Sequence, residues 1–279
     1  MVSKSDIVRA LEAVRDPELD IPITELGLID SITTGSGEVV EVTIRMPTYW
    51  CSPNFTYMIV EDARKALEKL VGPARVKVFL KDHHDGERIT KCVNSGLRFE
   101  ECYPEEAGEG LEGLRARMRE KAFLARLHGL IRILLRKGLT LGELERLRLE
   151  DLEVSQGSVT IRGAKRITLE SMEADRIVEY IGMLREAGVT RGPLLRRNLR
   201  GEPLGKEKME LLFSRARLTA STLSFNAELC KLLMNTRKLS STPRGKIRGR
   251  AIAPDPAQHP DYPGYETAGQ EAPEDQASP

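Results

Sequence analysis

The chain has 279 residues; 40% are apolar, only 5% are aromatic, and 43 lysines and arginines balance 42 aspartates and glutamates. This length predicts one or two domains with largely aliphatic cores, and the balanced charge excludes a global basic field for nucleic acid. Since no run of about 18 apolar residues occurs and the N-terminus is polar, we expect neither a transmembrane helix nor a signal peptide.

The first 81 residues alternate between helical and strand patterns. The predicted elements, in the order helix, strand, strand, helix, strand, cover residues 3–15, 27–34, 38–46, 53–70 and 75–81. Ser3 and Asp6 form a capping-box start for the first helix, and a glycine-rich turn joins the first two strands as a hairpin. The region is therefore predicted to be a small α/β sandwich.

Residues 82–110 are expected to be a connecting segment and linker, followed by a mainly helical domain over residues 111–241. The predicted helices cover residues 111–137, 171–187, 205–217 and 221–237, with a short helix opened by Thr140 and Glu143 and a hairpin over 158–169. Residues 242–279 are rich in proline and cannot bury enough apolar surface, so we expect a disordered tail. The whole chain is predicted to have an α+β fold.

Four cysteines occur, Cys51, Cys92, Cys102 and Cys230. Their spacing matches neither a disulfide framework nor a zinc site, so we expect reduced thiols in a cytoplasmic protein. Cys102 and Cys230 are expected to pack among apolar neighbours.

Cys51, in "MPTYWCSPN", stands where a predicted strand ends and a predicted helix begins. The unpaired N–H groups and the positive dipole end of a helix start favour a thiolate, the form that attacks or binds soft metal ions. Pro53 suits a first helical turn. A free cysteine is also often a small buried apolar residue, so position alone leaves both interpretations open.

Three stretches, "VRDPELDIPITELGLIDSI", "VEVTIRMPTYWCSPN" and "VEDARKALEKLVGPARVKVFL", resemble the metal–sulfur (iron–sulfur) cluster assembly factor family, over about residues 3–81. The family hallmarks correspond to residues 16–18, 25–28 and 48–51, together with Pro53. Two positions depart from the family pattern. Glu25 stands where the family usually has aspartate, and Ser52 separates Cys51 from its proline.

The resemblance implies a reactive Cys51 that helps to deliver an iron–sulfur cluster or iron to a client metalloprotein, with Asp16, Glu18 and Thr48 as supporting residues. For Asp16 and Glu18, helix termination and a solvent-facing position are the alternative interpretation, which is favoured for Glu18. A stable cluster usually has about four protein ligands, and this region offers one thiol. The cluster or iron is therefore expected to be transient, with no permanently bound cofactor. Either two subunits of a homodimer and outside thiols share it, or Cys51 makes a passing contact with the client or metal.

The run Asp82-His83-His84-Asp85 directly follows the third predicted strand, and its side chains suit Zn, Fe or Mn. Extended backbone would place at most His83 with Asp85, or His84 with Asp82, on one face. A solvated loop is the alternative interpretation. The run also resembles the DHH phosphoesterases, but the further carboxylates of that family are missing.

Residues 130–170 resemble the opening of the tyrosine recombinase catalytic domain. Thr140 stands where its first catalytic arginine is expected, so the arginine clamp on phosphate is missing and we expect no strand cleavage. A degenerate DNA-binding fold remains an alternative, using the basic stretches "LLRRNLRGEPLGK" and "TPRGKIRGR". The favoured hypothesis is a non-enzymatic maturation factor that binds neither membranes nor nucleic acid. Its "GLRFEE" stretch and helical half resemble accessory proteins of multicomponent oxygenases.

Overall fold

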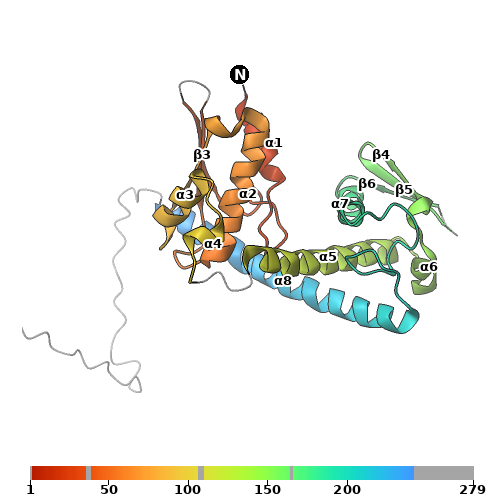
Figure 1. Ribbon diagram of the computed structural model, residues 1–279. Coiled ribbons are helices and arrows are strands. Elements are labelled where there is room, and N and C mark those ends of the chain that lie inside the picture. The colour runs from red at the N-terminus through yellow and green to blue at the C-terminus, as the bar shows by residue number, and fades with distance from the viewer. Residues whose placement is uncertain (1, 36–38, 106–109, 164–165, 242–279) are drawn as a thin grey trace, which may run out of the picture. The chain divides into compact units, whose positions relative to one another are not determined.

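The computed structural model describes residues 2–35, 39–105, 110–163 and 166–241. The described residues belong to one compact unit that ends at Ser241. It combines an α/β region with a mainly helical region, as predicted (Figure 1). The proline-rich segment expected to be a disordered tail, residues 242–279, lies outside the described residues.

The N-terminal region has the predicted order of elements. Its helices and strands are α1 (Lys4–Glu12), β1 (Ile29–Thr34), β2 (Val40–Arg45), α2 (Pro53–Val71) and β3 (Val76–Lys81), with the 3-10 turn η2 (Pro73–Arg75) before β3. The capping box of Ser3 and Asp6 opens α1 as expected. β1 pairs antiparallel with β2, and β2 pairs parallel with β3. The parallel pairing requires a long crossover, which α2 supplies.

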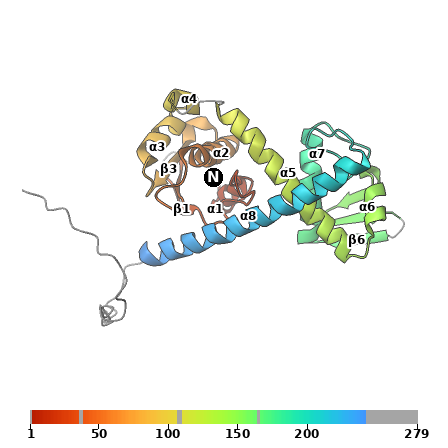
Figure 2. The same cartoon turned by 90° about the horizontal axis from the view of Figure 1, so that it is seen from below.

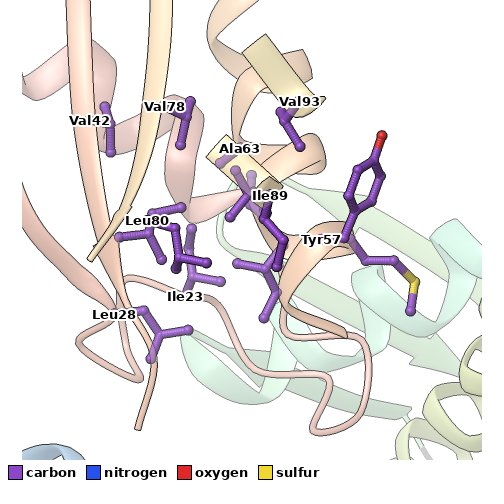
Figure 3. Close-up of a cluster of buried hydrophobic side chains, with 14 of the residues drawn as sticks. Ile23, Leu28, Val42, Tyr57, Ala63, Val78, Leu80, Ile89 and Val93 are labelled. Atoms are coloured by element: carbon purple, nitrogen blue, oxygen red, sulfur yellow. The ribbon is translucent and has the colours of Figure 1, made fainter. Parts of the chain in front are cut away.

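The first hydrophobic core lies between this sheet and its helices. Val42 on β2 and Val78 on β3 are opposite each other in register and are fully buried. Figure 3 shows them facing Ala63 of α2 and two side chains of the following segment, Ile89 and Val93. Because alternate strand residues point to the same face, the period-2 pattern of the sequence becomes one continuous apolar layer.

The segment expected to connect two domains adds two helices to the first region, α3 (Gly86–Asn94) and α4 (Phe99–Cys102). Ile89, Val93 and Phe99 are buried in the first core. A disulfide joins Cys92 to Cys102, which corrects the expectation that all four thiols are reduced. The turn between the two helices brings the two Cα atoms to 6.3 Å, a separation that a disulfide spans, although ten residues lie between them in sequence.

The second region consists of helices around a small sheet. Its elements are α5 (Gly110–Arg136), α6 (Leu141–Arg146), η3 (Leu149–Asp151), β4 (Leu152–Ser155), β5 (Ser158–Arg162), β6 (Arg166–Glu170), α7 (Met172–Glu186) and α8 (Lys206–Ser241). The predicted hairpin is confirmed as β5 and β6, and β4 adds a third antiparallel strand. A second hydrophobic core includes Phe123 of α5 and Tyr180 of α7, whose rings stack 5.5 Å apart.

Helix α8 is continuous where the sequence predicted two helices, over 205–217 and 221–237. The residues between them, Leu218 to Ala220, include neither glycine nor proline, so nothing in the backbone chemistry ends the helix there. Its side chains enter both cores: Leu212 and Ala216 are buried in the second, and Ala227 and Met234 in the first. The helix therefore joins the two halves of the chain.

Candidate functional site

Cys51 lies in the loop between β2 and α2, directly before Ser52, the N-cap residue of α2. Pro53 is the first helical residue, as predicted. The thiol is half-buried, and its sulfur lies 3.3 Å from the hydroxyl of Thr48. The Ser52 side chain makes no capping hydrogen bond. The start of α2 thus presents a free thiol beside a hydroxyl.

His83 fixes the backbone of Cys51 from the loop after β3. Its Nδ1 accepts the backbone N–H of Asp85 at 3.1 Å, so its proton lies on Nε2, which donates to the carbonyl oxygen of Cys51 at 2.8 Å. The side chain is 7% exposed, and burial lowers the pKa of His83, which keeps the ring neutral. Both ring nitrogens are engaged with backbone groups, so His83 positions the Cys51 loop in this arrangement.

The other three members of the Asp82–Asp85 run also have partners in the protein. Asp82 lies 3.3 Å from the buried guanidinium of Arg45, and Asp85 accepts a hydrogen bond of 2.5 Å from the Tyr103 hydroxyl. The ring of His84 stacks on those of Trp50 and His83, with centroids 5.2 and 4.5 Å apart. The expected alternation of side chains fails because the backbone turns at Asp82, whose φ is 53°.

The run is partly solvated: Asp82 and His84 are exposed, Asp85 is half-buried and His83 is buried. Within the described residues, no group of three or more His, Cys, Asp or Glu side chains is arranged to hold a metal ion. Instead, the run supports the Cys51 loop: the backbone N–H of His84 also donates to the carbonyl of Tyr49, at 3.0 Å. Tyr49 and Trp50, beside the thiol, are 47% and 75% exposed.

Asp16 and Glu18 lie in the turn after α1. The Asp16 carboxylate is 8% exposed and accepts the backbone N–H groups of Glu18 and Leu19, each at 2.9 Å. Burial raises the pKa of Asp16 to about 6, although these two hydrogen bonds oppose the rise. Glu18 is half-buried. The "GL" of the nearby "ELGL" stretch has a backbone role, since Gly27 has a φ of 73°, which favours glycine.

Helix α8 contributes a second thiol to this region, which the sequence did not predict. Cys230 is half-buried against the first core rather than enclosed within it. Burial, and then the nearby negative charges of Asp16, Cys51 and Glu18, raises the pKa of the Cys230 thiol to about 11. A residue far along the chain thus lies close to the predicted site residues.

Polar side chains of α8 hold it against the same region. Arg237 donates to the carbonyl oxygens of Met46 and Asp82, at 2.5 and 2.6 Å, on either side of the Cys51 loop. Lys231 pairs with Glu25 at 3.0 Å. Apolar residues at seven-residue steps along α8 are the feature of the sequence from which its packing against another part of the chain could have been predicted.

Two residues of the recombinase-like region make contacts within the chain. Thr140 is the N-cap of α6, bonded to Glu143. Arg197, in the first basic stretch, is 2% exposed and donates to the carbonyl oxygens of Pro193, Arg191 and Gly201. It therefore holds its own loop rather than a ligand. The second basic stretch, after Ser241, lies outside the described residues.

None of the helices in the described ranges is both long enough and apolar enough to cross a membrane. Residues 4–79 match the model of a family described as iron–sulfur cluster assembly protein. Over 78 residues the chain is 35% identical to the "Fe-S protein maturation auxiliary factor" of Porphyromonas gingivalis (strain ATCC BAA-308 / W83), a match that covers 28% of this chain and 72% of that protein. No solved structure matches the chain. Through its N-terminal region, the chain belongs to the iron–sulfur cluster assembly protein family.

Proposed function

We propose that this chain is an auxiliary factor for iron–sulfur protein maturation, in which Cys51 receives iron or a cluster and passes it to a client in the cytoplasm. The observation that carries the proposal is a free thiol at the start of α2, with its backbone held by His83 and its sulfur beside Thr48. A thiolate there suits soft metal ions and cluster iron. Family membership and the name of the relative from P. gingivalis support the same role.

The proposed contact is transient because the protein offers few ligands. Cys51 is the free thiol of the α/β region, since Cys92 and Cys102 are joined to each other. A stable cluster usually has about four protein ligands, so the client or a small thiol supplies the others. A carrier that holds its cargo by few ligands releases it readily, as delivery requires.

The exposed aromatic pair next to Cys51 is the proposed client contact. Trp50 is 75% exposed and Tyr49 is 47% exposed, and the ring of His84 stacks on the indole. Large aromatic side chains supply much of the binding energy of protein interfaces. A component of a multicomponent oxygenase is the client class we propose, on the resemblance of the helical half and its "GLRFEE" stretch to oxygenase accessory proteins.

Transfer to an acceptor tests this function. The chain is loaded anaerobically with iron and sulfide, its bound iron and sulfide are measured, and cluster formation in an added apo-ferredoxin is followed by visible absorbance. We expect Cys51→Ser to abolish loading and transfer, because a serine hydroxyl does not ionise near neutral pH. Cys230→Ser is the matched control and should retain transfer, since that thiol stays protonated. Equal transfer by wild type and Cys51→Ser would remove the proposed role of Cys51.

A further inference from the structure

Four exposed apolar side chains form a row along α8. Leu211, Leu218, Phe225 and Leu232 are seven residues apart, and they are 63%, 71%, 71% and 62% exposed. A seven-residue step keeps side chains on one face of a helix over several turns. Single exposed leucines are ordinary, but four large apolar side chains at regular steps along one helix face mark a candidate interaction surface. We call these four residues the outer stripe.

The outer stripe is on the opposite side of α8 from the face that packs within the chain. Met209, Ala216 and Leu223 are buried, and each precedes a member of the stripe by two residues. Two residues correspond to about 200° around a helix of 3.6 residues per turn. α8, the blue helix of Figure 2, therefore has one apolar face against the chain's own cores and a second one that is exposed among the described residues.

We infer that the outer stripe pairs with the outer stripe of a second copy of this chain, with the two α8 helices antiparallel. The symmetry of the pattern supports a two-fold axis that passes between Ser221 and Thr222. About this axis, Leu211 meets the partner's Leu232 and Leu218 meets the partner's Phe225. Such an interface is self-complementary, as two-fold dimers require. The contact runs from Leu211 to Leu232, which is 21 residue steps or about 32 Å of helix.

The charged positions beside the outer stripe are related by the same two-fold axis. Arg215 lies as far before the axis as Glu228 lies after it, so each faces the other residue type across an antiparallel pair. Their side chains are 57% and 75% exposed. Arg215 is 3.1 Å from Glu120, and Glu228 is 3.9 Å from Lys231, and both keep room for a further partner. A parallel pair would instead place Arg215 against Arg215, which disfavours that orientation.

The shape of the surface also suits helix pairing. A shallow hollow lies between Leu211 and Leu218, with Ser214, Arg215 and Ser221 in its lining. Small side chains at the predicted axis, Ser221 and Thr222, let two helix backbones come close together. A hollow between successive apolar residues accepts an apolar side chain of the opposite helix, as in coiled coils.

Sedimentation equilibrium of the full chain over a range of concentrations tests the inference. We expect wild type to form a dimer and Leu218→Glu/Phe225→Glu to be monomeric with unchanged helical circular dichroism. Met172→Glu is the matched control: Met172 is 78% exposed but lies on α7, so this variant should still dimerise. A wild-type chain that stays monomeric at all concentrations, or a dimer that survives the double variant, would overturn the inference.

Charge reversal tests the antiparallel register. Arg215→Glu and Glu228→Arg each place like charges together twice in the dimer, so each should weaken self-association by about tenfold. The combination of both changes should restore it. Glu120→Gln removes only the pair within one chain and should leave the dimer intact. Further weakening in the combined variant would exclude this register.

Discussion

Cys51 and Cys230 are the free thiols of the described residues, and their surroundings give them different reactivity. The pKa of Cys230, raised to about 11, keeps it protonated at neutral pH, whereas Cys51 lies directly before the N-cap residue of α2, beside the Thr48 hydroxyl. We expect iodoacetamide at pH 7 to modify Cys51 first, as read by peptide mass spectrometry. Cys92 and Cys102 should react only after reduction. Faster labelling of Cys230 than of Cys51 in the folded protein would contradict this assignment.

The buried carboxyl group of Asp16 makes the free energy of unfolding depend on pH. Its pKa is about 6 in the folded protein and 3.8 as a reference value, so the folded state holds the proton more tightly. The resulting stabilisation is fully present below about pH 4 and is lost as the pH rises through 6. An asparagine side chain at this position would still accept both backbone N–H groups without a charge. Asp16→Asn should therefore be more stable than wild type at pH 7, by on the order of 2 kcal/mol.

Urea unfolding of both proteins between pH 4 and pH 7.5 measures this difference. The gap between Asp16→Asn and wild type should open mainly between pH 4 and pH 6. His83, whose pKa burial lowers, adds a slope of the opposite sign below pH 6.5, but it is present in both proteins and cancels in the comparison. A gap that is constant with pH would mean that Asp16 is ionised in the folded protein over this range.

The residue types at the site could be predicted from the sequence, but several of their roles could not. Cys51 at a helix start follows from the strand pattern and Pro53, which are local features. The role of His83 depends on the turn at Asp82 and on a loop 32 residues earlier in the chain. Neither is encoded in the spacing of the histidines. Side-chain alternation therefore predicted the wrong neighbours for this run.

At the scale of elements, α8 is part of the first core although it comes last in the described chain. Met234 is 2% exposed and packs in that core. Truncating a buried methionine costs about 2–5 kcal/mol, so Met234→Ala should lower the free energy of unfolding by about 2 kcal/mol or more. Asn235→Ala, at the next and exposed position, is the control and should change it by less than about 0.5 kcal/mol.

Urea unfolding monitored by the fluorescence of Trp50, in the first region, is the measurement for both variants. If Met234→Ala proves as stable as Asn235→Ala, then α8 does not pack on the first core in solution.

Most elements could be predicted because their periodicity is local. The three strands of the first sheet and α2 begin and end within two residues of the predicted bounds. The longer α8, the strand β4 and the helices of the connecting segment were missed, because their apolar faces pack on distant parts of the chain. The sequence pattern shows which face of a helix or strand is apolar. The tertiary structure decides which other element that face packs against.

At the scale of the whole molecule, charged pairs and α8 join the α/β region to the helical region. The Arg126 guanidinium contacts both carboxylate oxygens of Asp20, each at 2.7 Å, and Arg15 pairs with Glu179 at 2.6 Å. Cys230 and Arg237 reach the surroundings of Cys51 from the other end of the described chain. The helical region thus contacts the surroundings of the proposed delivery site. This arrangement agrees with the proposal that the helical region helps to present the site to a client.

Maturation of the client in cells measures whether Cys51 delivers metal. An oxygenase client is co-expressed with wild type or Cys51→Ser as its only maturation factor, and its iron, sulfide and activity are measured after purification. We predict an intact Cys51→Ser protein, within about 1 kcal/mol of wild-type stability, and a client that lacks its cluster. A fully matured client beside Cys51→Ser would contradict delivery through this thiol and would leave Cys51 a packing residue.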